Sequence, residues 1–419
     1  MKQLDKIMLL IIFGLSCTVL VQAEELSLQE AEKIALSQDS LVFGLRSSAQ
    51  ALSEQSVADS TLPDPKIKLG LMNFPTDTFK RDQEPMTQVQ LGVQQMIPRG
   101  DSLAIKSRRS SIMSQGIRSG ASDRELQVLR DIRKNWLEAF YWSQAGAIVK
   151  ESRSLFNQLV SITRSHYATG RRTQQDVIRA VLELGLLDDR MVNMRSREEQ
   201  SRAMMMKWLG EAKSRLPLSA AIPNLPMPAT KKELLASIDQ HPKLRMRDSI
   251  VSAREAGVDL ARQAYKPSWL IDVTYGFRDG NNLNGSERAD LASAMLMFDV
   301  PLFTSKRQDR KLAASQQELA ATVYERDDVR STLISNLEQL TAEWMRLQER
   351  VKNYEELLTP QARANADSAL KSYQSDQGDF TSLMRARITD LETRLNEIRV
   401  KVDYAKTQAE LLYLAGEVK

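Results

Sequence analysis

Two stretches of the chain alternate apolar residues with polar ones, and each gives way at once to a long helical pattern. The stretches are residues 87–97 and 291–300, and proline follows each as Pro98 and Pro301. Proline closes a strand and cannot continue a ladder, so it marks the change of period from two to about 3.6. The pattern therefore predicts two strands, each leading into a helix.

A shorter alternating stretch precedes each of these strands, at residues 66–72 and 269–277. Proline stands before both, as Pro65 and Pro267. The prolines before the strand pairs lie 202 positions apart, and those after them lie 203 apart. The chain is therefore expected to contain two copies of one unit. The repeats are residues 24–216 and 231–419, joined by a proline-rich linker at 217–230.

The remaining patterns are helical and unusually long. The predicted helices are 25–61, 101–166, 174–209, 231–265, 305–372 and 380–414. The 66 residues of 101–166 would span roughly 100 Å, far more than a globular helix. Apolar residues in 333–358 and 391–412 recur at alternating intervals of four and three, which is typical of coiled-coil seams. Two long antiparallel helical hairpins are expected, with turns at 169–173 and 374–378.

Each predicted strand is apolar on one face and polar on the other. That pattern suits a half-buried sheet or the wall of a transmembrane barrel. Four strands cannot close a membrane barrel, so a barrel would need several chains that pool their strands in a ring. The apolar face of one strand carries Trp269, Ile271, Val273, Tyr275 and Phe277, which suits a lipid-facing girdle or a soluble sheet face.

Composition agrees with long solvated helices rather than a thick core. Charged residues make up 27% of the chain and aromatic residues 6%, and the formal net charge is only +4. Acidic and basic residues are interleaved, which does not favour nucleic acid as a partner. No phosphate-binding loop, nucleophile–base set or suitable carboxylate pair is present, so no enzyme activity and no cofactor are expected. His166 and His241 are too few for a zinc or copper site.

The first 23 residues resemble an export signal. A basic start precedes an apolar run at residues 7–20, and small residues end at Ala23. We expect cleavage there, which would leave a mature chain without cysteine. An uncleaved anchor is one alternative. A lipid-modified Cys17 is another, although glycine stands where lipoprotein signals usually have leucine, three positions upstream.

The predicted hairpin turns match one another and a known family. The first reads Tyr167-Ala-Thr-Gly170 and continues to Ala180; the second runs from Tyr373 to Ala386. The tyrosine-to-alanine spacing is 13 in both, and corresponding residues lie 206 apart. Signal, helix, strand pair, proline, long helix, turn and return helix, all repeated, resemble the outer-membrane efflux protein (TolC-like) family.

This resemblance implies a mainly α fold with a small β part. The family forms a homotrimer with a 12-stranded outer-membrane barrel and an α-helical tunnel in the periplasm. It implies a passive duct, embedded in outer-membrane lipid, that receives cargo from an inner-membrane resistance-nodulation-division pump through a periplasmic adaptor. We expect the adaptor to dock at the hairpin turns, on Thr169, Gly170, Arg171, Arg172, Asp376, Gln377, Gly378 and Asp379.

A finer resemblance concerns the cargo. Segments 62–75, 84–87 and 95–99 look like the branch that serves heavy-metal pumps, which implies export of cations such as copper or silver. A duct for drugs or secreted proteins is the alternative, and a structural periplasmic coiled-coil protein is a third. The 17 methionines include Met204–Met206, Met295 and Met297. Thioethers suit monovalent copper and silver, but methionine at helical or strand spacing more often serves packing.

The inner mouth departs from the family pattern. The best-known members carry aspartates nine and twelve residues after the second tip tyrosine, where this chain has Ser382 and Arg385. The first half has Asp176 and Arg179 at the same steps. We hypothesise a resting gate in which Asp176 pairs with Arg179 or Arg385; a ring lined by arginines is an alternative. A further alternative is that these charges are solvated or paired along a helix face.

Overall fold

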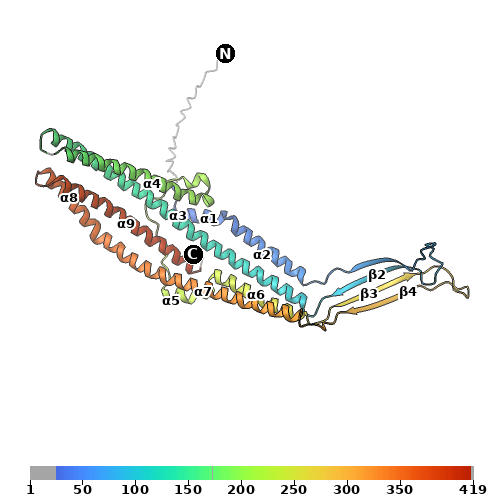
Figure 1. The fold of residues 1–419 in the computed structure, drawn as a ribbon. Helices are drawn as coiled ribbons and strands as arrows, with labels where there is room; N and C mark the ends of the chain where they lie inside the picture. Colours follow the sequence, from blue (N-terminus) through green and yellow to red (C-terminus); the bar gives the residue numbers. More distant parts are fainter. Residues whose placement is uncertain (1–24, 172, 417–419) are drawn as a thin grey trace, which may run out of the picture.

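The chain forms a long helical rod with a small sheet at one end and two hairpin turns at the other (Figure 1). The structure is a computed structural model that describes residues 25–171 and 173–416. The expected export signal (1–23), Cys17 and Arg172 lie outside the described residues. The expectation of a mainly α fold with a small antiparallel sheet is confirmed.

The sheet joins strands from both halves of the sequence. Its order is β1-β2-β3-β4, all antiparallel, with β1 Lys66–Met72, β2 Gln88–Ile97, β3 Trp269–Phe277 and β4 Leu291–Phe298. β2 pairs with β3 over nine residues, although more than 170 residues of chain separate them. The sheet therefore joins the two halves through backbone hydrogen bonds.

Two strands are shorter than the sequence suggested. β2 begins at Gln88 because the Thr87 hydroxyl donates to the Asn73 carbonyl at 2.7 Å, closing the loop before the strand. β4 ends at Phe298 rather than at residue 300. There the Asp299 carboxylate accepts a hydrogen bond from the Ser268 amide at 2.6 Å, which ends the ladder beside the helices.

The central helix of the first half is α3, Ser102–Ala168. α1 (Leu28–Gln38), α2 (Ser40–Asp59) and α4 (Gln174–Ser214) all pack along it. The helix expected at 25–61 is broken, because Asp39 leaves helical geometry and caps α2. α3 runs two residues past the expected end at 166. α4 continues beyond 209, but Gly210 interrupts it with φ of +71°.

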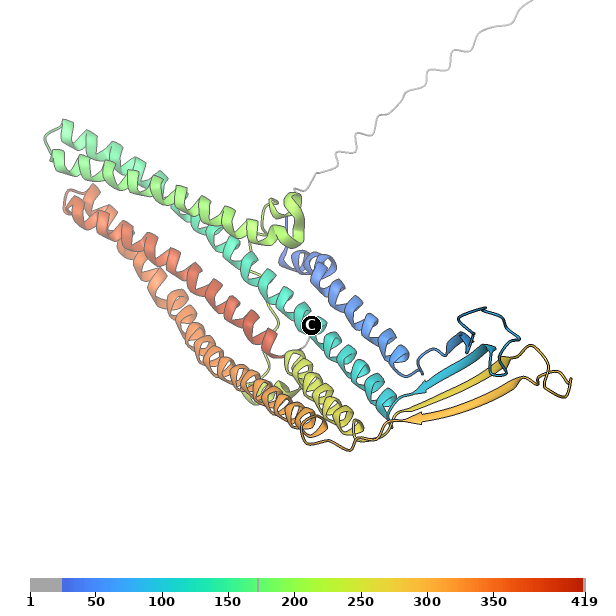
Figure 2. The same ribbon diagram turned by 45° about the vertical axis from the view of Figure 1, so that its right-hand side comes forward.

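The second half has more interruptions. α5 (Lys231–Ser237), a short 3-10 turn η1 (Ile238–Gln240) and α6 (Pro242–Gln263) replace the single helix expected at 231–265. His241 stands at the break and its ring accepts from the Lys243 amide. α7 (Gln308–Asn353), a π-helical turn η2 (Tyr354–Leu358) and α8 (Thr359–Gln374) replace 305–372. α9 (Phe380–Leu414) returns along α7, α8 and α3 (Figure 2).

Two local features explain the altered boundaries of α7 and α8. Residues 304–307 form a turn, in which the Arg307 amide donates to the Thr304 carbonyl at 3.0 Å, so that α7 starts at Gln308. Pro360 has no N–H group and its ring would clash with the carbonyl four residues upstream. A π turn stands directly before α8. Its backbone hydrogen bonds span five residues instead of four, which accommodates the proline at this point of the helix.

The largest hydrophobic core lies at mid-rod and extends toward the hairpin turns. Trp136 on α3 is fully buried, stacks on Phe140 with ring centroids 5.5 Å apart, and donates from Nε1 to the Leu26 carbonyl at 3.1 Å. The Leu26 amide donates to the Pro217 carbonyl at 2.8 Å. Trp136 therefore holds the start of the described chain and the linker between the halves against the longest helix.

Candidate functional site

The turn between α3 and α4 is tight and exposed. Gly170 has φ of +73°, a left-handed conformation that favours glycine. Its amide donates to the Tyr167 carbonyl and the Arg171 amide to the His166 carbonyl, each at 2.9 Å, which closes the end of α3. Thr169, Gly170 and Arg171 are exposed, as an adaptor-docking role requires.

The turn between α8 and α9 is closed by a different set of backbone hydrogen bonds. Asp376 has φ of +58°, and the amides of Gln377 and Gly378 both donate to the Ser372 carbonyl at 3.0 Å. A Cβ on Gly378 would lie 2.9 Å from Ser372 Oγ and 3.2 Å from its carbonyl carbon, so this turn has no room for a side chain there. Asp379 caps α9. Asp376, Gln377 and Asp379 are exposed and Gly378 is half-buried.

The two turns lie side by side in both views of the molecule (Figures 1 and 2). The rings of His166 and Tyr373 are 5.7 Å apart, and Tyr373 also contacts Phe380 at 5.9 Å. Arg179 donates to the Thr381 hydroxyl at 3.2 Å. The structure thus brings all predicted docking residues that it describes to one end of the rod.

The four proposed gate residues occupy the first turns of α4 and α9. Asp176 is half-buried and completes a capping box, in which its Oδ2 accepts from the Thr173 hydroxyl at 3.0 Å. Ser382 is bound by Asp379, with its amide donating at 2.8 Å. Arg179 and Arg385 are exposed. Within the described single chain Asp176 binds Thr173 and no ion pair joins it to either arginine, so the hypothesised pair would have to form between chains.

The sheet gathers an almost entirely apolar set of side chains on one face. Residues directly opposite in the register share a face. One face carries Ile67, Leu69, Leu71, Val89, Leu91, Val93, Gln95, Ile97, Trp269, Ile271, Val273, Tyr275, Phe277, Ala292, Ala294, Leu296 and Phe298. Only Gln95, near the helical end, is polar. An exposed apolar surface of this size marks a protein or membrane contact.

The opposite face carries all the charged residues of the sheet and all but one of its amide side chains. It carries Lys66, Lys68, Gln88, Gln90, Gln94, Asp272, Thr274 and Ser293, with Gly70, Gly92 and Gly276 among them. All four methionines of the sheet, Met72, Met96, Met295 and Met297, lie on this face, with Leu270 and Leu291. Period-two alternation predicted two faces for each strand, but only the register shows that the faces align across the sheet.

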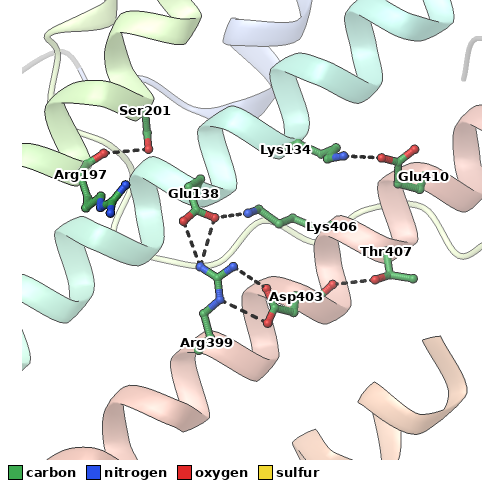
Figure 3. A network of polar contacts seen from close by, with 9 residues as sticks. All are labelled: Lys134, Glu138, Arg197, Ser201, Arg399, Asp403, Lys406, Thr407 and Glu410. Atoms are coloured by element: carbon green, nitrogen blue, oxygen red, sulfur yellow. Dashed lines mark hydrogen bonds and ion pairs between the residues drawn. The ribbon is translucent and has the colours of Figure 1, made fainter. Parts of the chain in front are cut away.

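A network of ion pairs between α3 and α9 was not expected from the sequence. Glu138 accepts from Arg399 at 3.0 and 3.1 Å and also from Lys406, while Lys134 pairs with Glu410 (Figure 3). Burial alone would raise the pKa of Glu138, but the hydrogen bonds from Lys406 and Arg399 lower it below its ordinary value. The network fixes α9 against α3, and its charges lie outside the apolar seams that the sequence reveals.

A second buried site was also missed. The Asp39 carboxylate accepts from Arg124 at 2.7 and 3.2 Å, from Trp208 Nε1 at 2.9 Å and from the Val42 amide at 3.0 Å. Burial alone would raise the pKa of Asp39, but these donors lower it to about 2. One side chain therefore joins α2, α3 and α4 where the first-half helix breaks.

Two kinds of site matter among the described residues: a cluster that could hold a metal ion, and a helix that could cross a bilayer. These residues contain no group of three or more histidine, cysteine, aspartate or glutamate side chains placed to hold a metal. His166 and His241 lie in different parts of the rod. Met205 is fully buried in the main core, while Met204 and Met206 are exposed. Over the same residues, no helix has both the length and the apolar character needed to cross a membrane.

Comparisons with known proteins agree with this geometry. Residues 236–417 match the sequence model of the family described as "Outer membrane efflux protein". No curated protein matches the sequence.

Solved structures share the fold over nearly the whole chain. The outer membrane protein VceC from Vibrio cholerae has 12% identity and a TM-score of 0.77, covering 93% of this chain and 96% of that one. CusC, described for transmembrane channel formation, has 12% identity and a TM-score of 0.77, covering 93% and 92%. The CmeC outer membrane channel from Campylobacter jejuni has 13% identity and a TM-score of 0.76, covering 93% and 85%. The second half of the chain thus matches the outer membrane efflux protein family, and the described chain as a whole has the fold of outer-membrane channels.

Proposed function

We propose that this chain is one subunit of the outer-membrane exit duct of a tripartite efflux pump. The observation that carries the proposal is the sheet. It has one face of exposed apolar residues and one polar face, and within the described residues β1 and β4 each pair on one side only. Three copies would pair these edges into a 12-stranded barrel with lipid outside and water inside. The duct performs no chemistry, because the pump supplies the energy.

The helical rod would extend from the outer membrane into the periplasm as a tunnel. The two halves contribute the same order of strand pair, long helix, turn and return helix, which supports the proposal of a duplicated unit. The exposed turns at the far end of the rod would meet a periplasmic adaptor, and through it an inner-membrane resistance-nodulation-division pump. The family match and the shared fold support this arrangement.

An assembly experiment tests the proposal. We expect the protein to partition with the outer membrane and to give the mass of a trimer in native mass measurement from mild detergent. The reason is that a four-stranded sheet with two open edges cannot close alone. A soluble monomer in the periplasmic fraction would refute the duct and would favour a structural coiled-coil protein instead.

For the cargo, we propose soft monovalent cations such as copper or silver. The supporting observations are the resemblance of segment 62–75 to the heavy-metal branch and the position of all four sheet methionines on the polar face. A tolerance assay in a strain that lacks the duct distinguishes the cargo. With its pump and adaptor present, the chain should restore tolerance to silver; tolerance restored only to organic drugs would contradict a metal cargo.

We further propose that Asp176 and Arg385 pair between neighbouring chains and hold the inner mouth closed. Three copies of Arg385 near a three-fold axis would repel by about 1 kcal/mol or more per pair, so interleaved carboxylates are needed for closure. Asp176→Asn and Arg385→Ser should each raise single-channel conductance in planar bilayers, and the double variant should add little to either.

The matched control for this test is Thr173→Ala, which removes the capping partner of Asp176 but leaves its carboxylate. It should keep the wild-type conductance. If it opens the channel as far as Asp176→Asn does, the effect comes from the helix cap. Unchanged conductance in both charge variants would place the constriction elsewhere.

A further inference from the structure

A charged pair crosses the polar face of the sheet. Lys68 Nζ on β1 lies 3.0 and 2.9 Å from the two carboxylate oxygens of Asp272 on β3. Gln94 Nε2 donates to the same carboxylate at 3.3 Å and Thr274 Oγ1 at 2.8 Å. Asp272 keeps only 9% of its side chain exposed, whereas Lys68 keeps 44%. We name these four residues the cross-strand brace.

The brace spans two strand spacings. β2 lies between β1 and β3, so Lys68 must reach across about 10 Å of sheet. The register places Gly92 directly between Lys68 and Thr274. A Cβ on Gly92 would lie 2.7 Å from Thr274 Oγ1, 3.0 Å from the Val273 carbonyl oxygen and 3.3 Å from Lys68 Cε. The absence of a side chain at Gly92 is therefore what lets the lysine lie flat over β2.

We propose that the cross-strand brace sets the ion selectivity of the barrel. This inference rests on the proposed function, in which the polar face lines a water-filled lumen. Three charged side chains lie on that face: Lys66, Lys68 and Asp272. The brace pairs two of them, Lys68 and Asp272, so that their charges compensate each other and both side chains lie flat on the sheet. In a trimer it would do so three times around the lumen, where low-dielectric walls strengthen the effect of any uncompensated charge.

Two single variants and their combination test the charges. Lys68→Gln uncovers the Asp272 carboxylate and should shift the permeability ratio toward cations, by about twofold or more. Asp272→Asn leaves Lys68 uncompensated and should shift the ratio toward anions by a similar factor. The double variant should return close to wild type. Reversal potentials in a potassium chloride gradient across planar bilayers give the ratio, and all variants are compared in the Asp176→Asn background, in which we expect the inner mouth to be open.

A glycine pair tests the brace geometry without changing any formal charge. Gly92→Ala places a Cβ in the path of Lys68 and should displace its side chain into the lumen, lowering single-channel conductance and shifting the permeability ratio. Gly70→Ala is the matched control on the same face, because its Cβ would meet only Gln90 at 3.9 Å. It should conduct like wild type. Trimer yield on unboiled gels is measured for every variant.

The outcomes separate this inference from the proposed function. A wild-type protein that forms no trimer in the outer membrane refutes the proposed function. A wild type that conducts, with Lys68→Gln leaving the permeability ratio unchanged, refutes the brace even if Asp272→Asn fails to assemble. Shifts in the charge variants together with wild-type behaviour of Gly92→Ala would mean that the two charges act separately and not as a brace.

Discussion

Cells that depend on this duct are expected to lose efflux completely when Gly170 and Gly378 are both replaced by valine. Gly170 has φ of +73°, where a β-branched residue is strongly strained. At Gly378 a Cβ would press on the backbone of Ser372, so the second turn must open to admit a side chain. Both changes deform the surface that we propose as the adaptor-docking site. The minimal inhibitory concentration of exported compounds measures the loss.

The control for this prediction separates docking from folding. Gly146 lies on α3, and a Cβ built there meets no atom within 4 Å other than its own helix backbone and chain neighbours. Gly146→Val should therefore keep both trimer yield and efflux. The double tip variant should keep trimer yield but not efflux. If it exports as well as wild type, the adaptor docks elsewhere on the rod.

Replacement of Asp39 by alanine is expected to destabilise the protein by about 3–5 kcal/mol, because it leaves the charge of Arg124 without its partner in a mostly buried position. The change also removes the cap of α2 and the acceptor for Trp208. Asp39→Asn keeps an acceptor oxygen and should cost less. Urea unfolding in detergent at neutral pH, followed by circular dichroism, measures both, and a loss below 1 kcal/mol for alanine would contradict the prediction.

The same residue predicts a pH dependence. Folding lowers the pKa of Asp39 from 3.8 to about 2. A carboxyl group with a lowered pKa stabilises the folded state above its unfolded pKa, and this contribution, about 2 kcal/mol, is lost as the pH falls from 4 toward 2. The Asp39→Ala variant should lack this part of the acid sensitivity, and equal acid sensitivity in both proteins would count against it.

The sequence predicted well those features that depend on local periodicity. The change of period at Pro98 and Pro301 indicated strands followed by helices, and the small antiparallel sheet in a mainly helical chain is present. The glycine of the first turn adopts the left-handed conformation that such a position needs. The periods of strands and helices depend only on residues close together in the chain, so one sequence is enough to recognise them.

Interruptions inside helices were harder to predict, because the apolar pattern continues through them. At Asp39 neither glycine nor proline marks the break. Its carboxylate caps α2 by accepting from the Val42 amide, and the donors on α3 and α4 that also bind it lie far along the chain. At residues 354–358 the heptad spacing is unbroken. Pro360 is the only local signal of the interruption, and the heptad pattern on both sides of it predicts a continuous helix.

Pairing between the two halves of the chain could not be predicted from local patterns. The pairing of β2 with β3 joins two halves of the chain, and no local pattern specifies it. The bond from Lys68 to Asp272 depends on that pairing. A single aspartate in a largely apolar strand, opposite a glycine-containing strand, was a usable hint that some cation had to reach it.

The π turn has a consequence for the symmetry of the rod. From Ser102 to Tyr167 and from Gln308 to Tyr373 the chain takes the same 65 steps, so the two runs match in length. α3 is regular helix throughout, whereas η2 winds one extra residue into a turn, which rotates everything beyond it by about 100°. The tip tyrosines accordingly differ: Tyr373 is fully buried, while Tyr167 is 48% exposed. Two runs of equal residue count therefore differ in rotational phase, and the winding of the helix between them determines which side each tip presents.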